Sequence, residues 1–307
     1  MTYDFAIIGG GPTGYSAAMY AGRLNLKTII FAGTTPGGLI ITTDTVENYP
    51  GFKQISGFDI FRKVQEHAQE YDVEEVDKDV SEVDWQKEAL SPFVLKTEEK
   101  TYQAKTVLFA TGANYRKLSV PGSKEFENKG VHYCALCDGF AYKNKIAAVV
   151  GGSDSAAKEA LELSQHASKV YIIYRGDKIH PEPVNGKRIE KNSKIEIISS
   201  TNVIKIKGSD RVTSVILDKP HSDTAELVLD GIFVAIGHIP RSELAEKIGV
   251  QTNEKKEIII NRYAETNIAG VYAAGDVVDT CFKQMIIGCA EGVMAAYRAY
   301  EYIAKTV

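Results

Sequence analysis

Cysteine is scarce in this sequence, with four residues in 307, too few for a scaffold held together by disulfides. There is no surplus of basic residues, because 36 Lys and Arg face 40 Asp and Glu, and no basic block indicates binding to nucleic acid or an anionic membrane. No apolar run approaches the ~18 residues of a transmembrane helix, and the first residues lack the basic segment of a signal peptide. We therefore expect a cytoplasmic globular enzyme.

The sequence contains two starts of a dinucleotide-binding βαβ unit, about 140 residues apart. The first has an apolar strand, a glycine turn, a helix and a second strand, at residues 5–8, 9–14, 15–21 and 28–31. The second repeats this order at residues 146–150, 151–156, 157–167 and 170–174. Further helices are expected over 56–71 and 284–304.

This repeat predicts an α/β protein with two Rossmann-like three-layer domains. The C-terminal segment has no glycine turn of its own, so we expect it to complete the first domain, with the second domain inserted. The expected boundaries are 1–113 plus 241–307 for the first domain, and 114–240 for the inserted second domain.

The first glycine turn has the full G-x-G-x-x-G pattern, at Gly9, Gly11 and Gly14. In this pattern the first glycine allows the tight turn, the second lets the backbone approach a pyrophosphate, and the third lets helix and strand pack closely. No acidic residue follows the second strand near 31–33 to bind a ribose hydroxyl, so backbone groups would have to do so.

The second glycine turn is weaker, because Ser153 stands where the middle glycine is expected. Serine still permits close approach if its φ is negative. The following strand ends at Arg175 rather than at an acidic residue, which favours NADP over NAD, although a solvated surface arginine explains it equally well.

Two cysteines separated by two residues, Cys134 and Cys137, are expected to carry the chemistry. This spacing allows a reversible disulfide in which one thiolate attacks and the other resolves. The alternatives are inert core thiols or a zinc site, but Cys281 and Cys289 lack a partner histidine pattern, so we expect no metal. The adjacent Asp138 is a candidate proton donor, and the Asp-Gly pair that it begins predicts a turn at a surface or cleft.

Two dinucleotide folds and one dithiol predict a relay from nicotinamide through a flavin to the disulfide, and then to a partner. The flavin is inferred because a second dinucleotide site is present and a hydride donor needs an intermediary before sulfur.

From end to end, the sequence resembles the low-molecular-weight thioredoxin reductases, which are FAD-dependent pyridine nucleotide–disulfide oxidoreductases. The matching motifs lie at residues 9–14, 46–52, 110–112, 134–139 and 266–276. The cysteine pair just before the second glycine turn is typical of this family. The resemblance implies that Cys137 is the sulfur near the flavin, that Cys134 attacks the partner disulfide, and that Asp138 is the acid/base.

The resemblance also implies two sets of cofactor-binding residues. For FAD these are Gly9, Gly11, Pro12, Thr13, Gly14, Gly38, Leu39, Asn48, Val80, Thr111, Gly112, Gly275, Asp276, Lys283, Gln284 and Met285. For NAD(P) they are Gly151, Gly152, Ser153, Asp154, Ser155, Tyr174, Arg175 and Gly237. Asp276 would hold the ribityl chain, and residues 283–285 would place a helix N-terminus against the flavin pyrimidine.

Several positions depart from the family pattern. The arginine run that binds the 2′-phosphate of NADP keeps only Arg175, so NADPH is only slightly favoured over NADH or another donor. Leu39 replaces a usual glutamine, and Ala141 replaces a common aromatic residue beside the cysteine pair, at a position that bears on recognition of a standard thioredoxin.

The predicted function is therefore a flavoprotein disulfide reductase acting on thioredoxin or on a thioredoxin-like or glutaredoxin-like protein. The family also implies a homodimer and a rotation of the two domains about hinges at 110–113 and 237–240. A different donor or disulfide partner is the alternative within this class. Two other classes compete with this one. A flavin reductase of the ferredoxin–NADP type is disfavoured by the presence of Cys134 and Cys137, which that type lacks, and a non-catalytic redox sensor would be excluded by rapid turnover with a protein disulfide.

Overall fold

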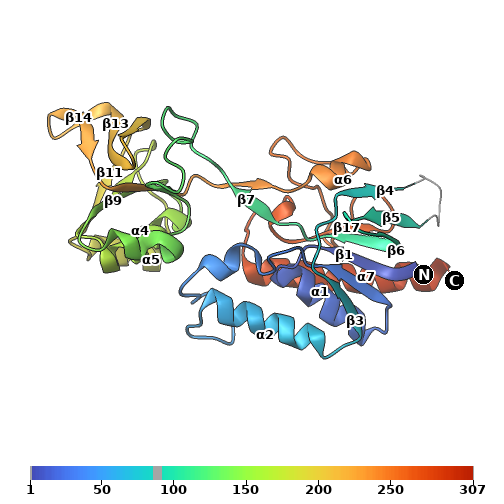
Figure 1. Cartoon of the computed structure of the whole chain (residues 1–307). Coiled ribbons are helices and arrows are strands. Elements are labelled where there is room, and N and C mark those ends of the chain that lie inside the picture. Colours follow the sequence, from blue (N-terminus) through green and yellow to red (C-terminus); the bar gives the residue numbers. More distant parts are fainter. Residues whose placement is uncertain (1, 86–91, 307) are drawn as a thin grey trace. The chain divides into compact units, whose positions relative to one another are not determined.

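The computed structural model describes residues 2–85 and 92–306, and it divides the chain into two compact units. Unit 1 comprises residues 1–114 and 239–307, and unit 2 comprises residues 115–238 (Figure 1). Within the described ranges, none of the helices combines the length and the apolar character that crossing a membrane would need.

Unit 1 is built on a sheet whose strand order is β3-β2-β1-β6-β5-β4, with β17 beside the end of β6. Strands β1 (Thr2–Ile8), β2 (Thr28–Phe31), β3 (Val73–Val76), β6 (Thr101–Phe109) and β17 (Val271–Ala273) are parallel. Strands β4 (Glu82–Asp84) and β5 (Phe93–Lys96) add an antiparallel edge. The C-terminal segment thus completes the N-terminal sheet.

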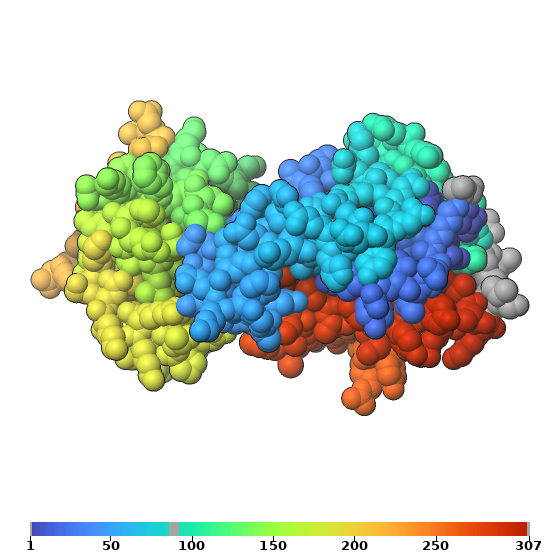
Figure 2. Space-filling model, turned by 90° about the horizontal axis from the view of Figure 1, so that it is seen from below, coloured from blue at the N-terminus to red at the C-terminus, as the bar shows by residue number. Residues whose placement is uncertain are grey.

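Three helices cover one face of this sheet: α1 (Pro12–Arg23), α2 (Gly57–Gln69) and α7 (Met285–Thr306) (Figure 1). The light-blue α2 and the red α7 reach the surface on the face seen in Figure 2. The short α6 (Glu243–Lys247) packs on the opposite face, together with Val250, Ile258 and Ile268 from the segment that follows it. In β1, Phe5 and Ile7 face the helices, whereas Ala6 and Ile8 face the other layer, which explains why residues 5–8 are all apolar.

Unit 2 has a parallel sheet of order β11-β10-β9-β15-β8. The strands are β8 (Val131–His132), β9 (Ile146–Val150), β10 (Lys169–Ile173), β11 (Ile195–Ile198) and β15 (Gly231–Val234). One face packs on α3 (Ala135–Asp138), the 3-10 turn η2 (Gly139–Tyr142), α4 (Asp154–His166) and α5 (Pro183–Glu190). The other face packs on an antiparallel sheet of β12 (Val203–Gly208), β13 (Val212–His221) and β14 (Thr224–Val228).

The chain passes between the units at β7 (Ala113–Tyr115) and β16 (His238–Pro240), which pair with each other. The two remaining 3-10 turns are η1 (Gly38–Thr42) and η3 (Gly275–Val277). The prediction of an α/β fold with two Rossmann-like units is confirmed. Asp138 and Gly139 lie in two consecutive short helical turns, α3 and η2, beside the exposed Cys137 and Phe140.

Candidate functional site

The first glycine turn joins β1 to α1, and two of its positions have no room for a side chain. Gly9 has φ +128°, and a Cβ there would lie 2.1 Å from the carbonyl oxygen of Ala110. A Cβ on Gly14 would lie 2.0 Å from the carbonyl oxygen of Gly9. Two of the three glycines are therefore required by backbone packing alone.

Gly11 differs from these two, because a Cβ added there would meet nothing within 4 Å. It is the N-cap of α1, with φ −89° and ψ 178°, and no side chain caps the helix. Pro12 occupies the first helical position, and the first turn has no acidic residue. The turn therefore presents open space at a helix N-terminus, as an approaching phosphate requires.

A second glycine segment lies against this turn. The amide of Gly37 donates to the carbonyl of Gly10 at 2.8 Å. Gly38 has φ +66°, and a Cβ on it would be 3.8 Å from the Cα of Gly11. The next residue, Leu39, accepts a hydrogen bond from the hydroxyl of Thr42 through its carbonyl, while Val80 is buried in the core of unit 1.

The motif at residues 266–276 reaches the same helix end because β17, which lies within it, pairs with β6. A Cβ on Gly275 (φ +83°) would lie 2.7 Å from Oγ1 of Thr13, and one on Gly288 would lie 2.6 Å from that atom. The amide of Gly275 donates to Glu291 at 2.9 Å. Among the described residues, the Asp276 carboxylate makes no hydrogen bond, so both its oxygens are available to a ligand.

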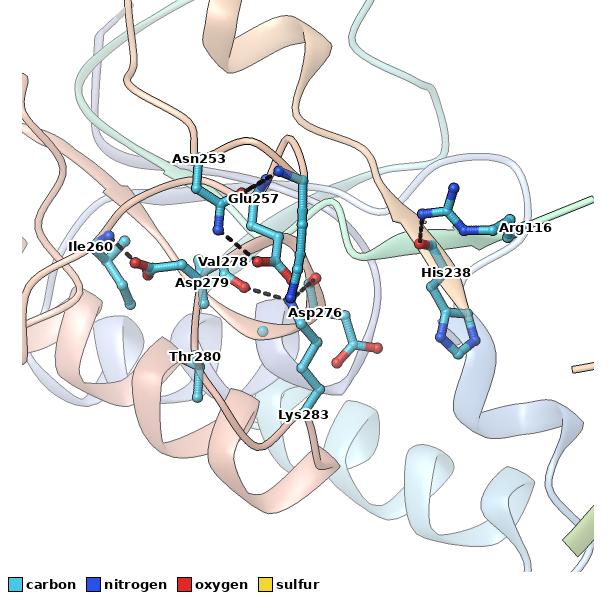
Figure 3. Close-up of polar contacts among 12 residues, drawn as sticks. Arg116, His238, Asn253, Glu257, Ile260, Asp276, Val278, Asp279, Thr280 and Lys283 are labelled. Atoms are coloured by element: carbon cyan, nitrogen blue, oxygen red, sulfur yellow. Dashed lines mark hydrogen bonds and ion pairs between the residues drawn. The ribbon is translucent and has the colours of Figure 1, made fainter. Parts of the chain in front are cut away.

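Lys283 anchors the loop between this motif and α7 (Figure 3). Its Nζ donates to the carbonyl oxygens of Asp276 at 3.0 Å and Val278 at 2.5 Å, and it pairs with Glu257 at 2.9 Å. The ammonium group is thus held by protein groups, and its observed role is to support the loop. Asn253 donates to the same Glu257 carboxylate at 2.7 Å.

The remaining expected FAD residues lie at two further places in unit 1. Nδ2 of Asn48 donates to Oε1 of Gln284 at 3.0 Å, just before α7 begins at Met285. The hydroxyl of Thr111 donates to the carbonyl of Arg241 at 2.6 Å, and Gly112 has φ +66°. An uncapped helix end, open space at Gly11 and the Asp276 carboxylate, which the described residues leave available, together fit a bound flavin dinucleotide.

In unit 2, the second glycine turn joins β9 to α4. Gly151 has φ +148°, and a Cβ there would lie 2.2 Å from the carbonyl oxygen of Ala235. Gly152 packs on the ring of Tyr174, which a Cβ would approach to 2.5 Å. Ser153 has φ −84° and is the N-cap of α4 without a side-chain cap, so the conformation that we required of this serine is confirmed.

The start of α4 is more acidic than the start of α1. Asp154 lies in its first turn, and its carboxylate accepts from the amide of Glu182 and from Nδ2 of Asn185, both at 2.8 Å, and pairs with Lys158 at 2.9 Å. These contacts lower its pKa, although burial acts in the opposite direction. The Asp154 carboxylate is therefore already bound by protein groups, and its contacts with Glu182 and Asn185 connect the start of α4 to the start of α5.

The other expected nucleotide residues surround this turn. His180 donates its amide to the carbonyl of Gly152 at 2.8 Å, and its ring contacts that of Tyr174 edge to face. Arg175 and Ser155 are exposed. Gly237 has φ +100°, and a Cβ there would meet nothing within 4 Å. The second turn can therefore hold a nucleotide, but Arg175 is the one arginine that the sequence offers there for a 2′-phosphate.

Cys134 and Cys137 form a disulfide with a Cα–Cα distance of 5.4 Å. Cys134 is the N-cap of α3, and its Sγ accepts the amide hydrogen of Cys137 at 3.1 Å. Cys134 is 6% exposed, whereas Cys137 is exposed. The two sulfurs therefore differ in access and in hydrogen bonding.

A largely buried histidine that the sequence analysis missed lies behind the pair. Nε2 of His132 is 2.8 Å from the hydroxyl of Tyr142, and its Nδ1 is 3.1 Å from Oδ2 of Asp138 at an angle that does not suit a hydrogen bond. Burial lowers the pKa of His132 and raises that of Tyr142 to about 12. A neutral imidazole that accepts from the tyrosine carries its proton on Nδ1, facing Asp138.

Glu159 was missed as well. Its carboxylate accepts the amide hydrogen of Ala135, the residue after Cys134, at 2.5 Å. Burial raises the pKa of Glu159 to about 7. The helical spacing contained a signal, because Ala156, Ala160 and Leu163 are buried on the same face of α4.

Comparison with known proteins places these features in one family. Residues 3–301 match the family described as pyridine nucleotide-disulphide oxidoreductase. The chain is 39% identical over 303 residues to a thioredoxin reductase of Bacillus subtilis, covering 98% of this chain and 95% of that protein.

Two solved structures are also informative. A thioredoxin reductase of Lactococcus lactis superposes with a TM-score of 0.94 at 35% identity, covering 99% of both chains. A ferredoxin-flavin thioredoxin reductase of Clostridium acetobutylicum is 30% identical with a TM-score of 0.55, covering 100% of this chain and 99% of that one.

Proposed function

The chain belongs to the pyridine nucleotide-disulphide oxidoreductase family, and from this premise we propose that it is a thioredoxin-disulfide reductase. It passes electrons from a reduced nicotinamide cofactor through FAD and the Cys134–Cys137 pair to the disulfide of a thioredoxin-like protein. The observation that carries this proposal is the Cys134–Cys137 disulfide at the start of α3, in a chain that carries two dinucleotide-type glycine turns.

Unit 1 is proposed as the FAD-binding domain. The α1 amides after Gly11 bind the pyrophosphate, because no side chain caps them and a Cβ at that position would meet open space. The Asp276 carboxylate accepts from hydroxyl groups of the ribityl chain, and Lys283 keeps that residue in place. Bound FAD supplies two-electron chemistry between a nicotinamide and a disulfide.

Unit 2 is proposed as the NAD(P)-binding domain, and the donor is best decided by experiment. We propose NADPH, on the support of Arg175 alone. The test is anaerobic titration of the holoenzyme with NADPH and, separately, NADH, with flavin absorbance followed throughout. Bleaching at low molar excess of NADPH is expected, whereas preference for NADH would refute the role of Arg175.

A donor other than nicotinamide is the second candidate, and it is favoured by a specific observation. The second turn carries Ser153 and an acidic first helical turn, and the chain resembles a ferredoxin-flavin thioredoxin reductase in fold and sequence. If neither nucleotide bleaches a flavin that dithionite reduces, this candidate replaces the first.

The two sulfurs are assigned the steps that the resemblance implies. Cys134 attacks the partner disulfide, and Cys137, the sulfur near the flavin, carries out the resolving step. In this exchange the Cys134 thiolate forms a bond to one partner sulfur, and the other partner sulfur leaves and takes a proton from Asp138. The Cys137 thiolate then displaces the partner and restores the internal disulfide.

Trapping distinguishes these roles. Cys137→Ser should accumulate a mixed disulfide between Cys134 and a thioredoxin that lacks its resolving cysteine, whereas Cys134→Ser should not. A mixed disulfide formed only by the Cys134→Ser variant would reverse the assignment. Each variant alone abolishes steady-state disulfide reduction while reduction of the flavin by its donor continues.

The assembly and compartment are also proposals. Exposed Met294, Tyr297 and Tyr300 on α7 support a homodimer, because large apolar side chains gathered on one helix face favour burial. Cys281 and Cys289 are free thiols, which supports a reducing cytoplasm. Equilibrium sedimentation of the holoenzyme tests the dimer, and a monomer at micromolar concentration would refute it.

A further inference from the structure

The first turn of the redox helix α3 is held from outside by the partly buried carboxylate of Glu159. Glu159, in the middle of α4, accepts the amide hydrogen of Ala135 at 2.5 Å. One residue earlier, Cys134 caps the same turn, with its Sγ accepting from the amide of Cys137 at 3.1 Å. Two backbone amides of a single helical turn thus donate to different acceptors, one to the Glu159 carboxylate and one to the redox-active sulfur of Cys134.

The surroundings of Glu159 disfavour its negative charge. It lies partly buried beside Ala156, Ala160 and Leu163 on α4. The hydrogen bond from the Ala135 amide favours the charged carboxylate, whereas the nearby charges come from two acidic residues, Asp138 on α3 and Glu162 on α4. Lys158, the neighbouring cation, pairs with Asp154 instead, and His166 lies 3.8 Å from Glu162. Burial and these two carboxylates raise the pKa of Glu159 to about 7.

We propose that Glu159 is a positioning residue that holds the first turn of α3 and couples reduction of the Cys134–Cys137 disulfide to uptake of a proton. This rests on the proposed function only in taking the pair as redox-active. None of the exchange steps described above uses this carboxyl group, and it acts on the sulfurs through the Ala135 amide and its own charge.

The coupling follows from charge balance. Reduction breaks the S–S bond and adds two electrons and two protons, which a dithiol reductant supplies as it closes to its own disulfide. When Cys134 ionises, its thiolate adds negative charge beside the turn that Glu159 already contacts. The carboxyl group then binds a proton more tightly in the dithiol state than in the disulfide state. Glu159 therefore takes up the proton that Cys134 releases, which would otherwise pass to solvent.

The experiment measures the dithiol–disulfide equilibrium of the holoenzyme in dithiothreitol redox buffers at several pH values. The state of the Cys134–Cys137 peptide is read by acid quenching, alkylation and mass spectrometry, which separates it from the free thiols. The variants are Glu159→Gln, which keeps an acceptor for the Ala135 amide but removes the charge, and Glu190→Gln. Glu190 is exposed at the end of α5, so its variant controls for net charge.

For each protein we compare the reduction constant at pH 6 with that at pH 8. The ratio of the two constants should be at least about threefold larger in the wild type than in Glu159→Gln, because each unit by which the pKa of Glu159 differs between the dithiol and disulfide states is about tenfold in equilibrium. Glu190→Gln should match the wild type. Each protein is loaded with FAD to the same flavin absorbance before the measurement. Equal pH dependence in the wild type and Glu159→Gln would then overturn the proposal.

Glu159→Ala removes the acceptor as well, and it should lower the free energy of unfolding more than Glu159→Gln does. If the Cys134–Cys137 equilibrium shows the expected pH dependence but the enzyme fails to reduce thioredoxin, the proposed function is refuted and this inference stands.

Discussion

The proposed FAD site makes a sharp prediction for two glycines that a sequence pattern treats alike. In Gly11→Ala, the new methyl group meets nothing within 4 Å, and the backbone at φ −89° suits any residue. In Gly14→Ala, the methyl group would lie 2.0 Å from the carbonyl oxygen of Gly9. The first change should therefore affect the ligand, and the second the fold.

The magnitudes follow from these contacts. Apoprotein carrying Gly11→Ala should unfold within about 1 kcal/mol of the wild type, since alanine at a compatible position has small effects. Gly14→Ala forces two backbone segments apart and should cost about 1–3 kcal/mol or more. For FAD, Gly11→Ala should lose about one charge-assisted hydrogen bond of ~1.5–3 kcal/mol, or about ten- to a hundredfold in dissociation constant.

The assay pairs urea unfolding of apoprotein with FAD titration followed by quenching of flavin fluorescence. Wild-type affinity for FAD in Gly11→Ala would refute the placement of the pyrophosphate beside Gly11. A larger loss of apoprotein stability in Gly11→Ala than in Gly14→Ala would refute the geometry of the turn itself.

Two further predictions concern buried polar contacts. Lys283→Met should lower the free energy of unfolding by about 1–3 kcal/mol at pH 7, because it strands two carbonyl groups and Glu257. Burial tends to raise the pKa of Glu257, but hydrogen bonds from Lys283 and Asn253 hold it below its usual range. The stabilisation from this contact is therefore present above pH ~4.3 and is lost as the pH falls further. Urea unfolding should show a smaller difference in the free energy of unfolding between variant and wild type at pH 3 than at pH 7. His132→Leu should lower kcat for disulfide reduction about tenfold without slowing flavin reduction, because Asp138 loses its imidazole neighbour. His132→Asn, which keeps an N–H near that position, should restore most of the rate, and equal rates in all three proteins would show that the histidine only fills space.

Local features of the fold were predictable from the sequence. The strand at 28–31 is as expected, and α2 and α7 begin within one residue of the predicted starts. Helix α4 begins at Asp154, earlier than the expected 157, because the helix starts directly after the Ser153 N-cap. These elements depend on turn residues and on the periodicity of apolar side chains, and both are legible in a short window.

The redox site was only partly predictable. The Cys-x-x-Cys spacing predicted the disulfide, because the sulfurs of two cysteines so near each other in sequence can meet without contacts from the rest of the chain. The different exposure of Cys134 and Cys137 was not predictable, because it depends on what packs on α3. His132 and Glu159 contact this helix from β8 and α4, and nothing in their local sequence announces that they face it.

The sequence by itself determined the two glycine turns, the cysteine pair and the family, because each is a local pattern with a specific physical requirement. Only the tertiary structure decided which distant groups meet. Pairing of β17 with β6 brings Gly275 against Thr13, and Asn48 reaches Gln284 across 236 residues of chain. Burial and close approach arise from packing among segments far apart in sequence, so the pKa of Glu159 and the open space at Gly11 exist only in the folded chain.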